Sequence, residues 1–170
     1  DRYANDLLAW IPRLVKLWRQ SCRGGATGLP PDRLTPDETR RLVGSVRLLT
    51  NAFSNRRALV RTPYLENPDL LGAYLLYFWP ISYIQARYCL DEVLRSTPLR
   101  VQSCLDLFCG PGPMSAALFD AGAIQITGMD YSNRALELSR QILSHHSSAL
   151  TTRRWDARTG VPESKARYDL

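Results

Sequence analysis

The sequence predicts an α/β fold in which a helical N-terminal lobe, residues 1–98, precedes part of a parallel sheet, residues 99–170. Three observations favour this fold. Apolar residues in the first part recur at helical spacing, three short apolar runs follow Pro98, and two helical patterns separate these runs. Strands that alternate with helices imply a parallel sheet with right-handed crossovers.

The first predicted helix is the stretch YANDLLAWIPRLVKLWRQ, residues 3–20. Apolar side chains recur there at spacings of three and four and so fall on one face. They are Leu7, Leu8, Ile11, Leu14, Val15 and Trp18. Pro12 is expected to kink or restart this helix, because proline lacks the N–H that the helix needs.

A Gly- and Pro-rich linker, RGGATGLPPDRL, separates this helix from the next. Thr35 is suited to the N-cap, Pro36 to the first helical position, and Glu38 to the third. The sequence therefore predicts a capping box, after which an apolar stripe continues the helix at Leu42, Val46 and Leu49.

The most aromatic part of the chain extends from Asp69 to about Leu94 and is interrupted by Pro80. Because it is apolar nearly all round, it predicts two short buried helices or one kinked helix. Its ring side chains would line a ligand pocket, stack on bases or fill the core, and their helical spacing favours the core. They are Tyr74, Tyr77, Trp79 and Tyr83.

The sheet is predicted from three apolar runs, residues 101–108, 125–130 and about 149–155. Helical patterns lie between them at Met114–Ala121 and from Asn133 to about Leu143. The expected strand order is 3-2-1, which is half of a larger sheet.

Charge is unevenly distributed along these 170 residues, whose net charge is +6. Residues 1–62 contain 12 basic and 5 acidic residues, whereas residues 63–170 contain 10 and 11. A basic lobe suits a polyanionic partner such as RNA. The alternative is that arginine simply covers solvated helix faces, and charge balance does not decide between the two.

Several classes of protein are disfavoured by composition. No apolar run approaches the roughly 18 residues of a membrane span, and the first twenty residues do not resemble a secretory signal. The four cysteines lack zinc-site spacing, and His145 and His146 have no third candidate ligand nearby. We therefore expect reduced thiols, no metal, no membrane and a cytoplasmic location.

The segment LDLFCGPGPMS follows the pattern of a strand, a glycine turn and a helix. Gly110 and Gly112 allow a sharp bend and a close ligand approach, but Ser115 stands where a dinucleotide fingerprint has its third glycine. No Gly-Lys-Ser/Thr follows, which excludes a phosphate-binding P-loop. Asp106 would repel a phosphate and attract an ammonium group.

These features predict S-adenosylmethionine as the ligand, since it carries an amino-acid end and an adenosine but no phosphate. Asp130 ends the second strand, 18 residues after Gly112, where a carboxylate reaches ribose hydroxyls. Asp156 follows the third strand and either accepts from the adenine amino group or caps a turn. Trp155 either flanks the adenine or fills the core.

The three motifs resemble those of class I methyltransferases over residues 100–158, with Phe108 where many members have glycine. The resemblance implies a Rossmann-like sheet and a cofactor site at Asp106, Phe108, Cys109, Gly110, Pro111, Gly112, Asp130, Tyr131, Asp156 and Ala157.

Two subfamilies compete for the closer resemblance. DLFCGPGPMSAALFDAG is similar to the opening motif of DNA cytosine-C5 methyltransferases, which usually begin there without a helical lobe. The positions Ala73 to Leu75, Pro80, Tyr83 and Gly110 to Gly112 are similar to Rsm-type methyltransferase-like proteins of the small ribosomal subunit, known from mitochondria and bacteria. This second resemblance is favoured, and it implies RNA and ribosomal partners, with a mitochondrial matrix location as the alternative to the cytoplasm.

Residues 167–170 are expected to begin a fourth strand on the far side of the first, so the sequence is interpreted as a fragment. Acceptor-site residues would then lie beyond Leu170, and the sequence names no catalytic residue. The favoured function is methyl transfer to RNA. The alternatives are a catalytically inactive RNA-binding or ribosome-assembly factor, a DNA cytosine methyltransferase and, remotely, a nicotinamide enzyme.

Overall fold

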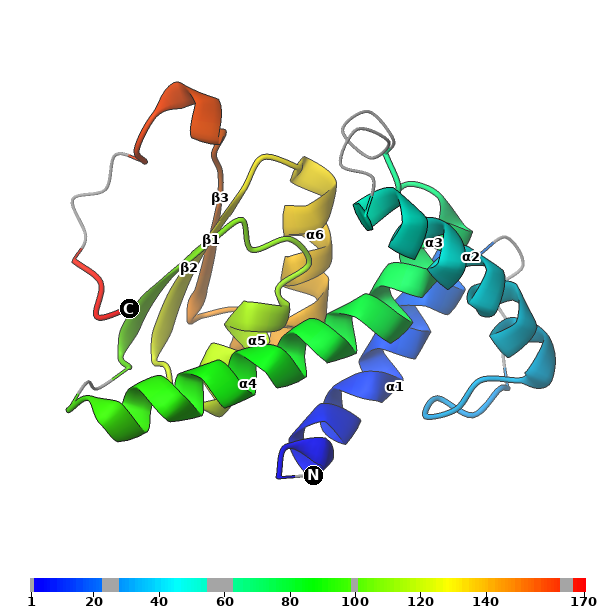
Figure 1. Cartoon of the computed structure of the whole chain (residues 1–170), viewed down its shortest axis with the longest axis horizontal. Coiled ribbons are helices and arrows are strands. Elements are labelled where there is room, and N and C mark those ends of the chain that lie inside the picture. Colours follow the sequence, from blue (N-terminus) through cyan, green and yellow to red (C-terminus); the bar gives the residue numbers. More distant parts are fainter. Residues whose placement is uncertain (1, 23–27, 55–62, 99–100, 163–166) are drawn as a thin grey trace. The chain divides into compact units, whose positions relative to one another are not determined.

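The computed structural model forms two compact units, Asp1–Ile81 and Ser82–Leu170 (Figure 1). It describes residues 2–22, 28–54, 63–98, 101–162 and 167–170. The first unit is helical and the second combines helices with a sheet. Helix α4, Trp79–Ser96, contains the point at which the units divide, and the predicted domain boundary at residue 98 stays a prediction.

Helix α1, Ala4–Ser21, buries a continuous apolar face that includes Leu14, Val15 and Trp18. Pro12 lies inside this single helix, so the predicted restart at that residue is wrong. Proline removes one backbone hydrogen bond, but burial of the tryptophan and leucine side chains on either side outweighs that local loss.

Helix α2, Pro36–Ser54, begins at the predicted capping box. The Thr35 N–H donates to Glu38 Oε2 at 2.8 Å, and the Glu38 N–H donates to Thr35 Oγ1 at 3.2 Å. Glu38 also accepts from Arg19, a buried residue of α1. The cap therefore fixes both the start of α2 and its contact with α1.

The aromatic segment forms one continuous helical path, so of the two predicted arrangements the structure has the single helix rather than the pair of short helices. Helix α3, Pro68–Ala73, leads into a π-helical turn, Tyr74–Phe78, and then into α4. Trp79 and Tyr83 are fully buried, as predicted for core residues. Tyr77 is exposed, however, so the favoured core role is wrong for this residue.

The second unit contains a parallel sheet of order β1-β2-β3, which confirms the predicted strands and their order. The strands are β1, Ser103–Leu107; β2, Gln125–Asp130; and β3, Leu150–Arg154. Helices α5, Pro113–Asp120, and α6, Asn133–Ile142, cover one face of this sheet (Figure 1). Small and branched side chains such as Ala116, Ile126 and Leu138 fill the space between helices and sheet.

The last two residues lie along the free edge of β1. The Asp169 N–H donates to the Ser103 carbonyl, and the Leu105 N–H donates to the Leu170 carbonyl, both at 2.8 Å. Since β1 uses its other edge to pair with β2, this is the edge at which a fourth strand is predicted. No helix in the described part of the chain is long and apolar enough to cross a membrane.

Candidate functional site

The carboxyl ends of the three parallel strands meet at one edge of the sheet, the upper end of the strands in Figure 1. Asp130 lies opposite Arg154 in the β2–β3 register, and Asp106 lies opposite Gly128 in the β1–β2 register. In open parallel sheets ligands bind in the crevice outside these carboxyl ends. The residues after β1, β2 and β3 are therefore the candidate site.

The turn after β1 requires left-handed backbone at three positions. Gly110 has φ 52° and Gly112 has φ 82°, which glycine adopts without a steric cost. Phe108 has φ 60°, an uncommon conformation for a bulky residue. Strained backbone of this kind persists where the surrounding structure enforces it, and it is concentrated at functional sites. Glycine would adopt this backbone conformation at position 108 without that cost.

Asp130 holds this turn against the end of β2. Its Oδ2 accepts from the Gly110 N–H at 3.0 Å, and its Oδ1 accepts from the Ser132 N–H at 2.8 Å. Each carboxylate oxygen has a second lone pair, so the group retains the capacity to accept further hydrogen bonds. The carboxylate thus links the glycine turn to the start of α6 and keeps acceptors for a ligand.

Asp106 lies behind the turn and is only 6% exposed. Its Oδ2 accepts from the Ser115 hydroxyl in the first turn of α5, at 2.6 Å. Burial raises the pKa of this carboxyl to about 6, although the Ser115 hydrogen bond opposes the shift. Asp106 would therefore act on a ligand through its charge rather than by contact.

Replacing Asp106 with asparagine should stabilise the fold at neutral pH. The raised pKa means that the folded state disfavours the charged carboxylate. The free energy of unfolding gained by Asp106→Asn should therefore grow as pH rises through 6, toward about 3 kcal/mol. It should vanish below pH 4, where the carboxyl is protonated in both states. Urea titrations of the wild type and Asp106→Asn across this range measure it, and equal stability at pH 8 would contradict the assigned burial cost.

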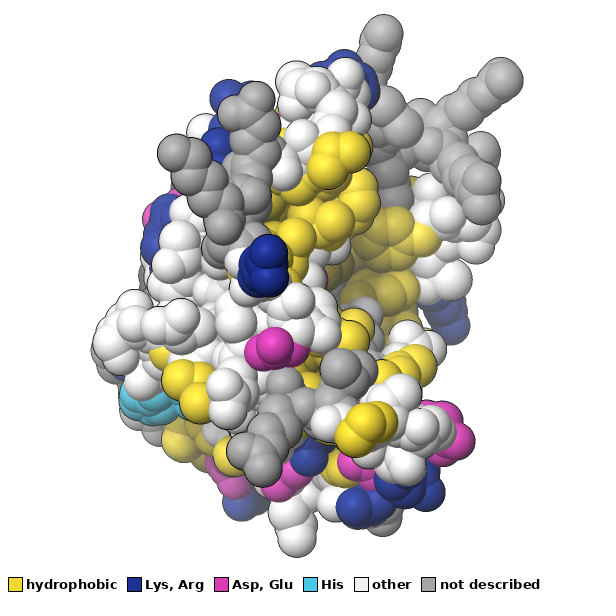
Figure 2. All heavy atoms as spheres, turned by 90° about the vertical axis from the view of Figure 1, so that its left-hand side faces the viewer, with side chains coloured by type: hydrophobic (Ala, Val, Ile, Leu, Met, Phe, Trp, Pro, Cys, Tyr) yellow, Lys and Arg dark blue, Asp and Glu magenta, His cyan; other side chains and the backbone are white. Residues whose placement is uncertain are grey.

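Two aromatic rings lie beside the turn. Phe108 is 64% exposed, and its ring contacts Trp155 at a centroid distance of 5.3 Å and an interplanar angle of 53°. Trp155 does not fill the core, which was one of its two predicted roles, because it is only half-buried. Other exposed large apolar side chains in this unit include Leu107, Met114, Tyr131 and Val161. Figure 2 shows exposed hydrophobic side chains on the sheet side of Figure 1.

Asp156 caps the short helix Ala157–Thr159. It accepts from the Arg158 N–H at 3.0 Å and from the guanidinium of the same residue at 2.6 Å. That guanidinium lowers the pKa of Asp156 to about 2. The geometry therefore shows the capping role, and contact of Asp156 with an adenine amino group stays a prediction. Ala157 is exposed beside it.

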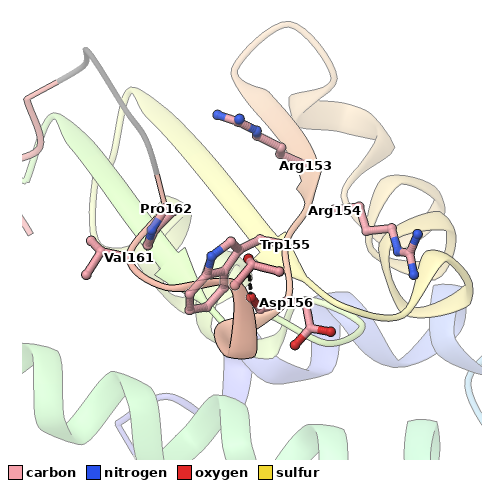
Figure 3. Close-up of a pocket in the computed structure, with 7 residues that line it drawn as sticks. Arg153, Arg154, Trp155, Asp156, Val161 and Pro162 are labelled. Carbon is pink, nitrogen blue, oxygen red and sulfur yellow. Dashed lines mark hydrogen bonds between the residues drawn. The ribbon is translucent and has the colours of Figure 1, made fainter.

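A cavity of about 540 Å³ opens beside this cap (Figure 3). It is lined by Arg153, Arg154, Trp155, Asp156, Thr159, Val161 and Pro162. Trp155 donates through its ring N–H to the Gly160 carbonyl at 3.1 Å, and Arg154 Nε donates to the Tyr131 carbonyl at 3.2 Å. The cavity therefore combines a fixed aromatic ring with charged groups at the end of β3.

The remaining predicted site residues contribute in different ways. Cys109 is buried and its thiol lies against Gly128, so only its backbone shapes the turn. Burial raises the pKa of that thiol, which keeps it protonated. Pro111 is buried and Tyr131 is exposed. Among the described residues no cluster of three His, Cys, Asp or Glu side chains is arranged to hold a metal.

The sequence did not predict the two serine side chains that pack around the glycine turn. The Ser115 hydroxyl donates to Asp106, whereas in the sequence Ser115 was noted only as the residue in place of a third glycine. Ser139 lies fully buried on α6, where a Cβ at Gly112 would stand 2.8 Å from its Oγ. The helical pattern gave no signal for this contact, because it joins two segments that are distant in sequence.

Comparison with protein families found a match over the sheet region. Residues 104–170 match the methyltransferase domain family. The methyltransferase match begins in β1 and includes the glycine turn, Asp130 and Asp156. It agrees with the predicted Rossmann-like fold class and supports a methyltransferase as the class of enzyme.

Comparison with solved structures found the crystal structure of a candidate RNA methyltransferase from Pyrococcus horikoshii. The two share 13% sequence identity, with 74% of this chain and 54% of that protein covered, at a TM-score of 0.37. The chain thus spans about half the length of that protein, and a likeness this distant carries no argument about function. Comparison with curated proteins found no match.

Proposed function

We propose that the chain carries the cofactor-binding part of an S-adenosylmethionine-dependent methyltransferase. The observation that carries this proposal is the bond between Asp130 and Gly110, because it brings an acceptor carboxylate to a glycine turn at the sheet's carboxyl edge. The family match over residues 104–170 supports it independently.

The groups at this edge of the sheet fit a ligand that has ribose hydroxyls and an amino-acid end. Asp130 would accept from the ribose hydroxyls with its remaining lone pairs. Gly110 and Gly112 would let the backbone approach the ligand, and the exposed ring of Phe108 and the half-buried ring of Trp155 would flank a purine. The buried charge of Asp106 would favour a nearby ammonium group.

When bound, S-adenosylmethionine supplies an electrophilic methyl group on a sulfonium. The chain's residues would hold and orient it, which is the main protein contribution to such a displacement. Cys109, with its buried and protonated thiol, has no access to serve as a nucleophile. No described residue is assigned to the methyl acceptor.

We further infer that the target is RNA, within the Rsm-type group associated with the small ribosomal subunit. The support is the sequence resemblance, together with a net charge of +6 that is concentrated in residues 1–62. A cytoplasmic location, or the mitochondrial matrix, belongs to the same proposal.

Isothermal titration of S-adenosylmethionine and of its demethylated product tests the cofactor assignment. Micromolar binding is expected, with a loss of at least tenfold in Asp130→Ala, because both the turn contact and the ribose acceptor are removed. Glu137→Ala, which removes an exposed carboxylate of α6, is the matched control and should bind like the wild type.

The outcomes of this titration separate the candidate functions. Wild-type binding that Asp130→Ala leaves unchanged would overturn the assigned site, and an absence of binding would overturn the cofactor. Binding without methyl transfer to any RNA would favour the catalytically inactive RNA-binding factor.

A further inference from the structure

Five aromatic side chains of the first unit form a connected cluster at its surface. The aromatic cluster consists of Phe53, Tyr64, Tyr74, Tyr77 and Phe78. Phe53 is central, with its ring centroid 4.9 Å from Phe78 and 5.9 Å from Tyr64, both edge to face. Tyr74 lies 5.8 Å from Tyr64, and Tyr77 lies 5.1 Å from Phe78.

The cluster is not a core, because none of its rings is fully buried. Tyr77 is 46% exposed and Phe53 is 38% exposed, whereas Trp79, directly after the cluster, is fully buried. Contiguous exposed apolar rings mark interaction sites in soluble proteins. Their mutual contacts hold the rings in place, so a partner would meet an ordered surface.

The backbone beneath the cluster is unusual. Tyr74, Tyr77 and Phe78 lie on the π-helical turn, in which the Trp79 N–H bonds to the Tyr74 carbonyl. Such turns are rare and frequently occur at functional sites. Tyr74, Tyr77 and Phe78 are spaced three and four residues apart, and residues at this spacing are neighbours on one face of a helix.

Charge in the sequence between two members of the cluster indicates the chemistry of its partner. The sequence between Phe53 and Tyr64 contains three arginines and no acidic residue, although residues 55–62 lie outside the described structure and are not part of the site. Two acidic residues follow Tyr64 in the sequence. Asp69 is paired with Arg41, whereas the negative charge of Glu66 would disfavour an anion. Planar rings in a chain whose sequence between Phe53 and Tyr64 is rich in arginine favour a polyanion that has planar groups of its own.

We propose that the aromatic cluster is a base-stacking platform for single-stranded RNA. It belongs to the first unit, whereas the proposed cofactor site belongs to the second. The inference rests on the proposed function only in taking RNA as the nucleic acid. Stacking on Tyr77 and Phe53 would tolerate any base, since every base has a π-face.

Fluorescence anisotropy with a short, labelled single-stranded RNA of mixed sequence tests this inference on the whole chain. Tyr77→Ala and Phe53→Ala should each weaken binding about five- to a hundredfold, the range for one lost stacking contact. Tyr77→Leu keeps an apolar side chain but no ring, and it should lose as much as Tyr77→Ala. Leu48→Ala, an exposed apolar residue of α2 outside the cluster, is the control and should bind like the wild type.

Several results would overturn the platform. These are RNA affinity unchanged in both ring variants, an equal loss in Leu48→Ala, or duplex RNA bound as tightly as single strands. Retention of RNA affinity in Tyr77→Leu would also overturn it, because an apolar side chain without a ring cannot stack on a base. Cofactor titration of the same variants keeps the proposals apart, because Tyr77→Ala should bind S-adenosylmethionine normally and Asp130→Ala should bind RNA normally.

Discussion

Replacing Arg19 with methionine is expected to lower the free energy of unfolding by about 3 kcal/mol. The Arg19 guanidinium donates to both Glu38 oxygens, at 2.8 and 2.9 Å, and to the Pro30 and Arg33 carbonyls. Methionine keeps most of the side-chain volume but leaves the Glu38 carboxylate without its charged partner. Urea unfolding at neutral pH measures the loss.

The pair Arg40–Asp37 on the exposed side of α2 provides the control. Arg40→Met should cost less than about 1 kcal/mol, because exposed ion pairs contribute little. A double variant that replaces both Arg19 and Glu38 with apolar residues should recover part of the loss, since no charge then stays buried. A cost for Arg19→Met no larger than that for Arg40→Met would refute the assigned role.

The same ion pair predicts the response of the first unit to acid. Arg19 lowers the pKa of Glu38 to about 2 in the folded state. A carboxyl with a lowered folded pKa contributes stability above its unfolded pKa, near 4.5, and loses it as pH falls toward 2. The wild type should therefore lose stability across this interval more steeply than Glu38→Gln.

Replacing Gly112 with alanine is expected to destabilise the second unit and to abolish cofactor binding. The new Cβ would lie 2.8 Å from Ser139 Oγ and 3.0 Å from Leu143 Cδ1, and the backbone has φ 82°. The left-handed conformation costs about 1–2 kcal/mol, and crowding of a packed interior adds about 1–3 kcal/mol. Relief of the clash would shift the turn that the ligand contacts.

Gly122→Ala separates the cost of the left-handed backbone from the cost of side-chain crowding. Gly122 also has a positive φ, of 102°, but nothing lies within 4 Å of a Cβ there. This variant should show only the backbone cost and an unchanged affinity for S-adenosylmethionine. Urea unfolding and titration with S-adenosylmethionine compare the two variants. Equal losses of stability would show that the Ser139 and Leu143 side chains move aside without a free-energy cost. Ser139→Gly added to Gly112→Ala should restore part of the stability.

Local features of the sequence were enough to predict much of the fold. The apolar runs gave the three strands and their order, because strand and helix periods differ and parallel crossovers have one hand. The capping box at Thr35 was predictable since its hydrogen bonds join residues three apart. The position of Asp130 followed in the same way from its place at the end of a strand.

Contacts between distant residues decided what the sequence left open. Tyr77 and Tyr83 occupy the same aromatic pattern, yet one is exposed and the other buried, because packing partners rather than periodicity determine burial. The sequence predicted that the charge of Asp106 acts on the ligand, but the side chain is buried and accepts a hydrogen bond from the Ser115 hydroxyl.

The places of candidate site residues in the fold were thus predictable where they depend on backbone position, as for Gly110 and Asp130. They were not predictable where a role depends on side-chain neighbours, as for Ser139 beneath Gly112 or for Trp155 against Phe108. The sequence by itself determined the strands, the turn and the caps, since these depend on near neighbours. Only the tertiary structure decided burial, ion pairing and ring contacts, because these depend on residues that folding brings together.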